Sequence, residues 1–496
     1  MKKQSLWENT YEISKENSGI LDKDIDVDIL IIGGGITGLS TMMELRNVKK
    51  SMVMIEKGTI GMGVTKNTTG KLTFLQGNFS TIEKAHDFFS AYLYYRAQRD
   101  AIEIVKNRVS KFQIDCELEE EHSYLMALKE SEIASIQKEE AFLRKAGIPY
   151  EVEPLPISQP CQYAIKVTNT YTFHPLKYLE ALKNIILKKG HKIYEHTKAL
   201  TLDKEDGGYI VKTEHAMIHA REVVVATHYP FFVVPGFIPF KSYIEKSYLL
   251  ASKVSDYLPV QAINMKKPIV SIRYWNQESP YLIYGGESTK TSKIINPIEK
   301  REIIEEKYKT NLLLGNIEYV WETHDVMSVD SLPFIGKVND DNPNLYLATG
   351  YSKWGMTNST IAGRIIADMI QNKKNPYESL FLPNRKSIPL FLGSIMSGIE
   401  NSSAYFLAKI KKRRTFYDEH VEIIYENGKR IGVYIDQFGN RFPVSNVCPH
   451  MKCNLVFNPE TFTWDCPCHG SSFDINGNVM TGPSSYSIKL EKEKKD

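Results

Sequence analysis

The stretch Val27-Asp-Ile-Leu-Ile-Ile-Gly-Gly-Gly-Ile-Thr-Gly38 is the most informative part of this chain for the fold of its first domain. Its first half, Val27–Ile32, is apolar and β-branched and ends at glycines, a pattern typical of a strand buried within a parallel sheet. Thr37–Arg46 has helical spacing, and Ser51–Ile55 is a second apolar run. Together these segments predict a strand–helix–strand unit of about thirty residues, which is the size of a βαβ unit.

Three glycines of this stretch, Gly33, Gly35 and Gly38, form the pattern G-x-G-x-x-G between a predicted strand and a predicted helix. The first glycine permits a tight turn, the second lets the backbone approach a pyrophosphate, and the third lets the helix pack against the strand. Glu56 ends the second strand, 21 residues after Gly35, where a carboxylate can accept hydrogen bonds from ribose hydroxyls. This context predicts a dinucleotide site with its phosphates at the helix N-terminus. The alternative is a glycine turn that only packs a helix.

Composition excludes several classes of protein. The chain has 496 residues, of which 42% are hydrophobic and 24% charged, unlike a collagen, a disordered chain or a multi-span membrane protein. The formal net charge of +3 gives no reason to expect a nucleic-acid partner. The polar N-terminus lacks the apolar core of a secretory signal, and the longest apolar-leaning stretch, Ile388–Ile399, is too short to span a bilayer. We therefore expect a cytoplasmic protein without a transmembrane segment.

The rest of the chain divides into two regions with different secondary-structure patterns. Up to about residue 380, helical and strand patterns alternate, which indicates an α/β or α+β architecture. The expected helices are Phe88–Val109, Ser131–Lys145, Lys177–Lys189 and Thr360–Ile370, and the expected strands are Glu222–Thr227 and Leu345–Ala348. From about Glu419, short strands alternate with turn signals at Asn427-Gly428, Phe438-Gly439-Asn440 and Asn476-Gly477, which predicts a small all-β domain. We place the domains at residues 1–385 and 419–496. Residues 386–418 form a linker whose basic run Lys409–Arg414 is either a solvated face or a contact with an anionic membrane.

Four of the six cysteines fall within twenty-one residues near the C-terminus. They belong to two short runs, Cys448-Pro-His-Met-Lys-Cys453 and Cys466-Pro-Cys-His469, and each run offers cysteine and histidine. Thiolates suit a ferric iron with bridging sulfides, and neutral imidazoles on a second iron raise the potential of such a site. A tetrahedral zinc site and a set of structural thiols are the alternatives.

The spacing C-x-H-x2-C-x12-C-x-C-H strongly resembles that of the Rieske [2Fe-2S] domain, over about residues 419 to 492. By position in that motif, Cys448 and Cys466 are implied to hold one iron, and His450 and His469 the other. The resemblance therefore implies a [2Fe-2S] cluster as a cofactor.

Further positions match the cytochrome-bc-type branch of the same family. Cys453 and Cys468 match the pair that forms a loop-bridging disulfide there, and Gly482-Pro483 matches the proline loop that covers the cluster. Ser471 keeps a hydroxyl that can donate to a bridging sulfide, but Phe473 stands where the usual tyrosine hydroxyl would donate. Because each such hydrogen bond stabilises the reduced cluster, we expect a potential below that of respiratory-chain Rieske proteins.

The first domain carries a second resemblance. The motifs, in order along the chain, are Thr65–Thr73, Phe173–Lys177, Val223–Thr227, Trp321–Gly336 and Ala348–Thr357. Together with the glycine pattern they resemble the D-amino-acid-oxidase-like (DAO) flavoprotein oxidoreductases. This resemblance implies an α/β Rossmann-like FAD-binding domain, interleaved with a mixed α+β substrate domain, and hence FAD as the dinucleotide.

The glycine pattern and the resemblance together imply a set of FAD-binding residues. They are Gly33, Gly35, Thr37, Gly38, Glu56, Lys57, Thr69, Lys71, Leu72, Ala226, Thr227, Gly336, Gly350, Lys353, Trp354, Gly355, Met356 and Thr357. Gly350 and Lys353–Thr357 are implied to lie near the isoalloxazine ring. For Tyr351 and Trp354 the alternative is ordinary aromatic packing beside a glycine turn.

The chain has a single G-x-G-x-x-G, so it offers no second nucleotide site for NAD(P)H, and electrons are expected from a small reduced substrate. The two resemblances imply a dehydrogenase that oxidises a small amine or amino acid by hydride transfer to FAD. Its electrons would pass through the Rieske centre to an unknown one-electron partner. Oxidation of a 2-hydroxy acid, a flavin oxidase, and a non-catalytic electron-transfer or redox-sensing module are alternatives, and the last would lack a pocket over the flavin. Arg273 could hold a substrate carboxylate, its alternative being a strand ion pair. No residue is assigned as a catalytic base.

Overall fold

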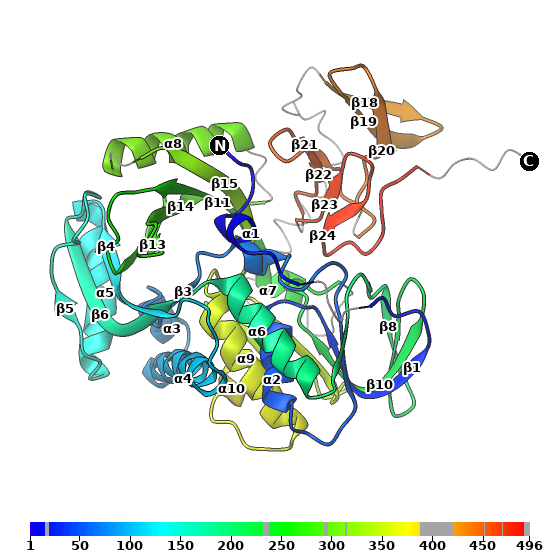
Figure 1. Cartoon of the computed structure of the whole chain (residues 1–496), viewed down its shortest axis with the longest axis horizontal. Helices are drawn as coiled ribbons and strands as arrows, with labels where there is room; N and C mark the ends of the chain where they lie inside the picture. Colours follow the sequence, from blue (N-terminus) through cyan, green and yellow to red (C-terminus); the bar gives the residue numbers. More distant parts are fainter. Residues whose placement is uncertain are drawn as a thin grey trace, which may run out of the picture.

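A computed structural model describes residues 1–14, 19–231, 238–291, 296–312, 315–386, 420–450, 452–468 and 470–490 (Figure 1). Almost all of the predicted linker 386–418 lies outside these residues, including Ile388–Ile399 and the basic run Lys409–Arg414. None of the helices within the described ranges is long and apolar enough to cross a membrane.

The glycine pattern lies in the first of two sheets in the larger domain. Strand β1 (Ile25–Ile32) lies in parallel between β2 (Met52–Ile55) and β10 (Met217–Val225), and β10 pairs in parallel with β17 (Leu345–Thr349). The sheet order is β16-β17-β10-β1-β2-β7, with β8 and β9 paired beside β10. The remaining strands are β16 (Phe334–Lys337), β7 (Lys192–Tyr194), β8 (Thr201–Glu205) and β9 (Gly208–Lys212).

Helices cover this sheet because their apolar faces need a partner. Helix α2 (Ile36–Leu45) packs on α9 (Gly355–Ile370) and on α6 (Pro175–Lys188), and α4 (Phe88–Phe112) packs on α9. The expected βαβ unit is therefore confirmed, as are the helices predicted around residues 88–109, 177–189 and 360–370. The shorter helices are α1 (Leu6–Thr10), α3 (Phe79–Ala85), α7 (Ile238–Lys241), α10 (Glu378–Phe381) and the 3₁₀ helix η1 (Val64–Asn67).

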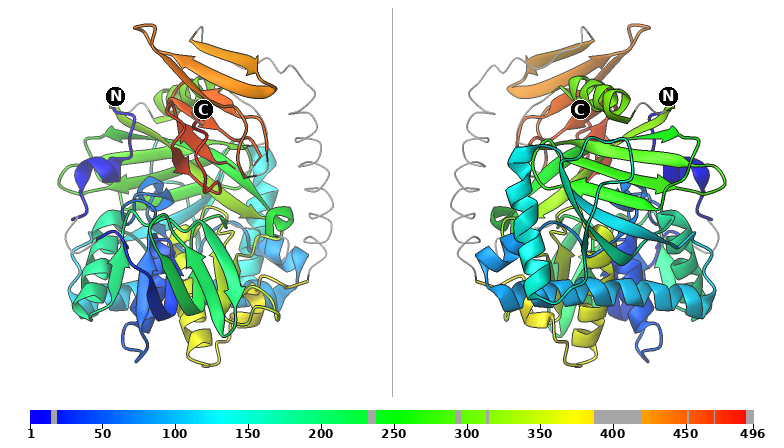
Figure 2. Two further views of the ribbon diagram at one scale, coloured as in Figure 1. Left: turned by 90° about the vertical axis from the view of Figure 1, so that its right-hand side faces the viewer. Right: turned by 90° about the vertical axis from the view of Figure 1, so that its left-hand side faces the viewer.

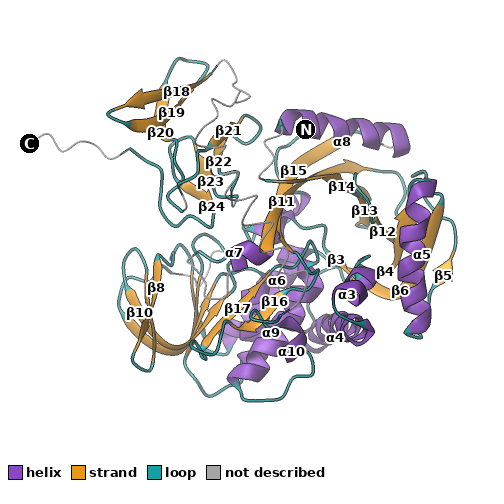
Figure 3. Ribbon diagram, turned by 180° about the vertical axis from the view of Figure 1, so that it is seen from behind, coloured by secondary structure: helices purple, strands orange, loops and turns teal. Residues whose placement is uncertain are grey.

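The second sheet of the larger domain is mixed and has the order β15-β11-β14-β13-β12-β4-β6-β3, with β5 paired to β6. Helix α8 (Pro297–Leu312) packs on β11 and β14, and α5 (Glu130–Lys145) packs on β4 and β6 (Figure 3). The strands are β3 (Lys71–Leu72), β4 (Glu119–Ala127), β5 (Glu151–Val152), β6 (Tyr163–Thr172), β11 (Ser242–Lys253), β12 (Val260–Asn264), β13 (Val270–Trp275), β14 (Tyr281–Lys290) and β15 (Ile317–Ser328). The two sheets give the interleaved arrangement that the resemblance implied.

The C-terminal domain is all-β, as expected, and contains two small antiparallel sheets. The first has strands β18 (Val421–Glu426), β19 (Lys429–Ile435) and β20 (Arg441–Ser445). The second has strands β21 (Val456–Asn458), β22 (Thr463–Asp465), β23 (Ser472–Asp474) and β24 (Val479–Thr481). Trp464 fills the space between the sheets and lies so close to Gly432 that a Cβ there would overlap its ring.

The C-terminal domain lies against the larger domain rather than apart from it. Figures 1 and 2 show β21–β24 next to the larger domain and β18–β20 on the outer side. Ion pairs and hydrogen bonds connect the two domains, including Arg301–Glu460 at 3.1 Å and Lys57 Nζ to the Met480 carbonyl at 3.1 Å. This position brings the loops of the small domain to the carboxyl ends of the parallel strands, where α/β sheets bind ligands.

Candidate active site and metal centre

A cavity of about 310 Å³ lies where three parts of the chain meet. The glycine turn after β1 forms one wall, the strands β11, β14 and β15 form another, and loops of the C-terminal domain form a third. Gly35, Ser288 and Pro483 represent these three walls. The cavity therefore joins the predicted dinucleotide site to the predicted cluster loops.

The glycine turn fits a bound pyrophosphate. Gly33 has φ +115°, and a Cβ on it would lie 2.5 Å from the Ala226 carbonyl oxygen, so a side chain is excluded by packing. Gly35 differs, because a Cβ there would meet only Thr65 Oγ1, at 3.4 Å, among the atoms of the described residues. Gly35 is also the N-cap of α2 without a side-chain cap, so the helix end faces the cavity with its amide groups.

Glu56 lies at the cavity wall at the end of β2. One carboxylate oxygen accepts from the Gly34 amide at 2.7 Å, and the other accepts from the Gly58 amide at 2.9 Å. These backbone donors hold the carboxylate in one orientation while each oxygen keeps further acceptor capacity. The arrangement fits the expected role of Glu56 toward ribose hydroxyls.

Most of the predicted FAD-binding residues line this one cavity. Those that line it are Gly33, Gly35, Thr37, Glu56, Lys57, Thr69, Lys71, Ala226, Thr227, Lys353, Trp354, Gly355 and Met356. Those that do not line it are Gly38, Leu72, Gly336, Gly350 and Thr357. In this second group, the Thr357 hydroxyl accepts from Gln76 at 3.1 Å, and Gln76 does not line the cavity either. Tyr351 also lines the cavity, and its hydroxyl lies 3.1 Å from Thr37 Oγ1.

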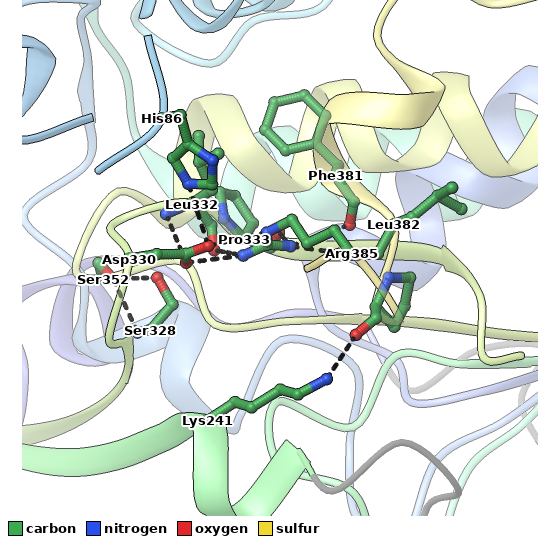
Figure 4. Close-up of polar contacts among 11 residues, drawn as sticks. His86, Lys241, Ser328, Asp330, Leu332, Pro333, Ser352, Phe381, Leu382 and Arg385 are labelled. Carbon is green, nitrogen blue, oxygen red and sulfur yellow. Dashed lines mark hydrogen bonds and ion pairs between the residues drawn. The ribbon is translucent and has the colours of Figure 1, made fainter. Parts of the chain in front are cut away.

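The turn that leads into Lys353 has a strained backbone, and a hydrogen bond from Ser328 stabilises it. Ser352 and Lys353 have φ +49° and +76°, values that non-glycine residues rarely adopt and that cluster at functional sites. The Ser352 hydroxyl accepts from the Ser328 amide at 3.1 Å (Figure 4). The buried Asp330, two residues after Ser328, pairs with Arg385 at 2.8 Å, a contact that Figure 4 also draws. Burial would raise the pKa of Asp330, but Arg385 and His86 lower it to about 2, so the pair stays charged.

Of the two possibilities for Arg273, a substrate contact or a strand ion pair, the first does not fit its position in the structure. Its side chain is only 1% exposed and lies outside the cavity wall. The guanidinium donates to the Tyr274 carbonyl at 3.2 Å, to the Phe173 carbonyl at 3.3 Å and to the Thr69 carbonyl. The guanidinium thus fixes the loop that carries Thr69, because three backbone acceptors occupy it.

Several further residues line the cavity that the sequence did not assign as binding residues, although His324 and Asp325 belong to the motif Trp321–Gly336. They are Ser247, Ser271, Ser288, His228, His324 and Asp325. They come from the second sheet and from the end of β10, and for the serines only the alternation of side chains along those strands could have hinted at them. Among the described residues, the buried Nε2 of His228 has no hydrogen-bond partner, which fits a ligand in this space.

Two lysines place their ammonium groups at this polar wall. Lys353 Nζ lies 3.1 Å from Glu245 Oε2 and donates to the hydroxyls of Ser247, at 3.1 Å, and Ser288. Lys71 Nζ donates to the Ala262 carbonyl and to Ser271 Oγ, both at 2.8 Å. At this wall Lys353 is therefore paired with a carboxylate, whereas Lys71 contacts only neutral acceptors.

Burial shifts the titration of the groups around the cavity. It lowers the pKa of Lys71 to about 7, helped by nearby Arg273, and it raises the pKa of Asp325 to about 6 against the effect of Lys353. Burial also lowers the pKa of His324 to about 3 and that of His228 to about 4. Near neutral pH both histidines are uncharged, and Lys71 can accept a proton from a bound molecule.

The two cysteine–histidine loops of the C-terminal domain have matching backbone geometry. In the first, the Cys448 amide donates to the Cys453 carbonyl at 2.8 Å and the Lys452 amide to the Cys448 carbonyl at 2.9 Å. In the second, the Cys466 amide donates to the Ser471 carbonyl at 2.7 Å and the Gly470 amide to the Cys466 carbonyl at 3.0 Å. Equivalent bonds thus close both loops, as a site with one cysteine and one histidine from each loop requires.

The side chains that the structure describes fit the iron–sulfur assignment. Cys448 and Cys466 are buried, and burial lowers the pKa of His450, which favours the neutral form that binds metal. His469 lies outside the described residues, so its predicted role stays a prediction. Ser471 Oγ accepts from the Ser484 amide at 3.0 Å, so the hydroxyl proton remains for a cluster sulfide.

The predicted disulfide is present between Cys453 and Cys468 and ties the two loops together. The predicted proline loop lies beside them, and Gly482 and Pro483 line the cavity. Phe473 is fully buried in the core of the small domain.

Comparison with known proteins agrees with this geometry. The family model of FAD dependent oxidoreductases (DAO) matches residues 28–369. The chain belongs to this family of oxidoreductases. The model of the Rieske [2Fe-2S] domain matches residues 408–490, so the chain is an FAD enzyme that also carries a Rieske [2Fe-2S] centre.

Three relatives illustrate the relationship. A putative Rieske 2Fe-2S iron-sulfur protein, YhfW of Bacillus subtilis (strain 168), is 32% identical over 478 residues, which are 95% of this chain and 94% of the relative. Gamma-glutamylputrescine oxidoreductase of Escherichia coli (strain K12) is 22% identical over 389 residues, which are 72% of this chain and 87% of the relative. The crystal structure of glycine oxidase from Geobacillus kaustophilus superposes with a TM-score of 0.62 at 18% identity and covers 73% of this chain and 99% of the oxidase.

Proposed function

We propose that the protein is a dehydrogenase that oxidises a small amine or amino acid by hydride transfer to FAD. Its electrons then leave one at a time through the Rieske centre to a one-electron acceptor. The single observation that carries this proposal is the shared cavity: the glycine turn, the ring-side residues and the cluster-side proline loop border the same space.

The cavity favours an enzyme over a redox sensor. A module that only relays electrons needs no polar side chains beside the ring end of the flavin site. Here Ser247, Ser288 and Asp325 of β11, β14 and β15 line the same cavity as Lys353–Met356. Ligand sites in proteins are usually concave, with a few converging polar groups.

Two observations support an amine or amino acid as substrate. The named activities of relatives, a gamma-glutamylputrescine oxidoreductase and a glycine oxidase, both concern compounds with a C–H bond beside nitrogen. In addition, the wall offers Lys71, with its pKa lowered to about 7 by burial, as a proton acceptor. Loss of a proton makes the amine neutral, and a neutral amine is the form that can release hydride.

Bound FAD supplies the two-electron acceptor, and the cluster supplies a one-electron carrier. The residues of the chain bind and orient the substrate, take up its proton at Lys71 Nζ and keep bulk water away from the reacting carbon. The walls do this because three parts of the chain enclose the cavity.

The test is an anaerobic titration of the purified holoenzyme with amines, amino acids and 2-hydroxy acids. Absorbance reports reduction of the flavin, and EPR reports the reduced cluster. An amine that bleaches the flavin and then produces the Rieske signal supports the proposal. If only 2-hydroxy acids reduce the flavin, the substrate is a 2-hydroxy acid and the proposed amine or amino acid is wrong. If dithionite reduces both centres but no compound reduces the flavin, the dehydrogenase proposal fails. Rapid reoxidation of the reduced flavin by air, without involvement of the cluster, identifies an oxidase instead.

A further inference from the structure

Lys246 on β11 connects the two domains through an ion pair. Its Nζ lies 3.0 Å from Asp465 Oδ2 of the C-terminal domain and 2.9 Å from Glu322 Oε1 of β15. The lysine side chain is 13% exposed, and the two carboxylate side chains are about as sheltered, at 23% and 19%. One cation is thus shared by two carboxylates from different domains, in a place where water screens charge weakly.

Asp465 is prepared for this contact by its own domain. Asn458 Nδ2 donates to Asp465 Oδ2 at 3.1 Å, and the Thr463 hydroxyl donates to Asp465 Oδ1 at 2.8 Å. The carboxylate is therefore oriented before it meets Lys246. Such preorganisation distinguishes a built contact from a chance pairing of surface side chains, which contribute little.

The contact lies next to the metal centre. Asp465 directly precedes Cys466, a predicted iron ligand, and the same loop continues to Gly470. A Cβ on Gly470 would lie 3.4 Å from Ile244 Cδ1 and 3.8 Å from His324 Cδ2, so this loop is in van der Waals contact with β11 and β15. His324 also lines the flavin cavity.

The proline loop makes a second contact with the larger domain. Lys57 Nζ donates to the Met480 carbonyl at 3.1 Å, and Lys198 Nζ donates to the Ser485 carbonyl. Between these two anchors, Thr481 to Ser485 form part of the cavity wall. Both the ligand loop and the covering loop of the Rieske domain therefore face the flavin side of the molecule.

We propose that Lys246 is a positioning residue that docks the Rieske domain with its cluster-binding tip turned inward, onto the flavin cavity, through Asp465 and Glu322. The inference rests on the proposed function, because docking is useful only if electrons cross from flavin to cluster within one chain. The reduced flavin then loses two electrons and a proton. Each electron in turn reduces one ferric iron of the cluster to ferrous, and an external one-electron oxidant empties the cluster between the two transfers.

Charge reversal tests the inference on the full-length holoprotein. Lys246→Glu puts three carboxylates together and Asp465→Lys puts two lysines together, whereas the double variant Lys246→Glu/Asp465→Lys restores the pair. Lys246→Met removes the charge with little change in volume, in case a reversed charge prevents folding. Arg441→Gln is the matched control, because it breaks the 2.6 Å ion pair with Glu422 on the outer sheet of the same domain.

Two measurements are made on each protein. Hydrogen–deuterium exchange of residues 470–485 reports docking without any turnover. Flash photoreduction of the flavin, followed by absorbance of the cluster, reports internal electron transfer without any substrate, and ferricenium then serves as the external oxidant.

We expect faster exchange of residues 470–485 in both single reversals and in Lys246→Met. We also expect flavin-to-cluster transfer at least about tenfold slower, which corresponds to about 1.4 kcal/mol of docking free energy. The double reversal should recover both properties, and Arg441→Gln should match the wild type.

The two possible failures can be told apart. If the wild type itself transfers no electrons from flavin to cluster, the proposed function fails. If the wild type transfers them but the Lys246 variants keep wild-type exchange and rate, the docking role of Lys246 is refuted while the proposed function stands. If the double variant does not recover wild-type exchange and transfer rate, a direct Lys246–Asp465 contact is also refuted.

Discussion

Alanine at Gly33 and at Gly35 separates packing of the glycine turn from binding of the cofactor. At Gly33, a Cβ would lie 2.5 Å from the Ala226 carbonyl oxygen, and the backbone has φ +115°, a conformation that alanine strongly disfavours. At Gly35 the backbone has φ −83°, which suits any residue, and a Cβ would meet only Thr65 Oγ1 among the described atoms, at 3.4 Å. The same substitution therefore has different physical consequences two residues apart.

The magnitudes follow from these distances. Backbone overlap and the unfavourable φ together should cost Gly33→Ala about 3 kcal/mol of unfolding free energy. Gly35→Ala should change the unfolding free energy of the FAD-free protein by less than about 1 kcal/mol, because a compatible alanine also restricts the unfolded chain. Its methyl group takes space at the cavity wall beside the α2 N-terminus, so FAD affinity should fall at least about tenfold.

Thermal unfolding of the FAD-free proteins and fluorescence titration with FAD measure the two effects. Gly33→Ala should lower the melting temperature clearly, and Gly35→Ala should leave it near that of the wild type while weakening FAD binding. Wild-type FAD affinity in Gly35→Ala would refute the placement of the pyrophosphate at this helix end. Equal destabilisation by both substitutions would refute the packing argument.

Four further predictions test other parts of the molecule. Arg273→Met should lower the unfolding free energy by about 3 kcal/mol, measured by calorimetry, because three backbone carbonyls lose their donor. Steady-state kinetics should show a nearly unchanged KM for an identified substrate. Lys71 has a pKa of about 7 instead of 10.5, so its amine becomes a proton acceptor as the pH rises through 7. The rate of flavin reduction should therefore rise with pH around 7, and Lys71→Met should abolish this rise in stopped-flow pH profiles. Replacing Cys453 and Cys468 by serine opens a connection across 15 residues and should destabilise the Rieske domain by about 3 kcal/mol, seen as earlier thermal bleaching of the cluster at unchanged FAD content. Phe473→Tyr should raise the cluster potential by adding a hydroxyl donor, and an unchanged or lower value in protein-film voltammetry would contradict the expectation.

Local sequence patterns correctly predicted individual strands and loops, because steric and chemical effects between neighbouring residues determine these features. The run Val27–Ile32 becomes β1, since an apolar β-branched segment followed by glycines has few other stable conformations. The two cysteine–histidine runs form matching loops joined by the Cys453–Cys468 disulfide, as the motif implied. In each case the residues that determine the feature lie within a few positions of one another, apart from the disulfide partner.

The contacts of Arg273 and the residues of the polar cavity wall could not be predicted from such local patterns. A lone arginine in a strand can face a ligand, a carboxylate or backbone carbonyls, and only the packing of the Thr69 loop against β13 decided for the carbonyls. Ser247, Ser288 and Asp325 come from three strands that are distant in sequence, and their meeting depends on the pairing of β11 with β14 and β15.

The sequence alone indicated both kinds of cofactor site, because each is marked by short motifs whose glycines, cysteines and histidines must lie at set spacings. The relative position of the two sites follows only from the packing of the folded domains. The small domain lies with Asp465 on Lys246 and its proline loop in the wall of the flavin cavity. The pairing of a charge on β11 with a charge more than two hundred residues later leaves no periodicity or spacing in the chain, since it arises from the packing of complete domains.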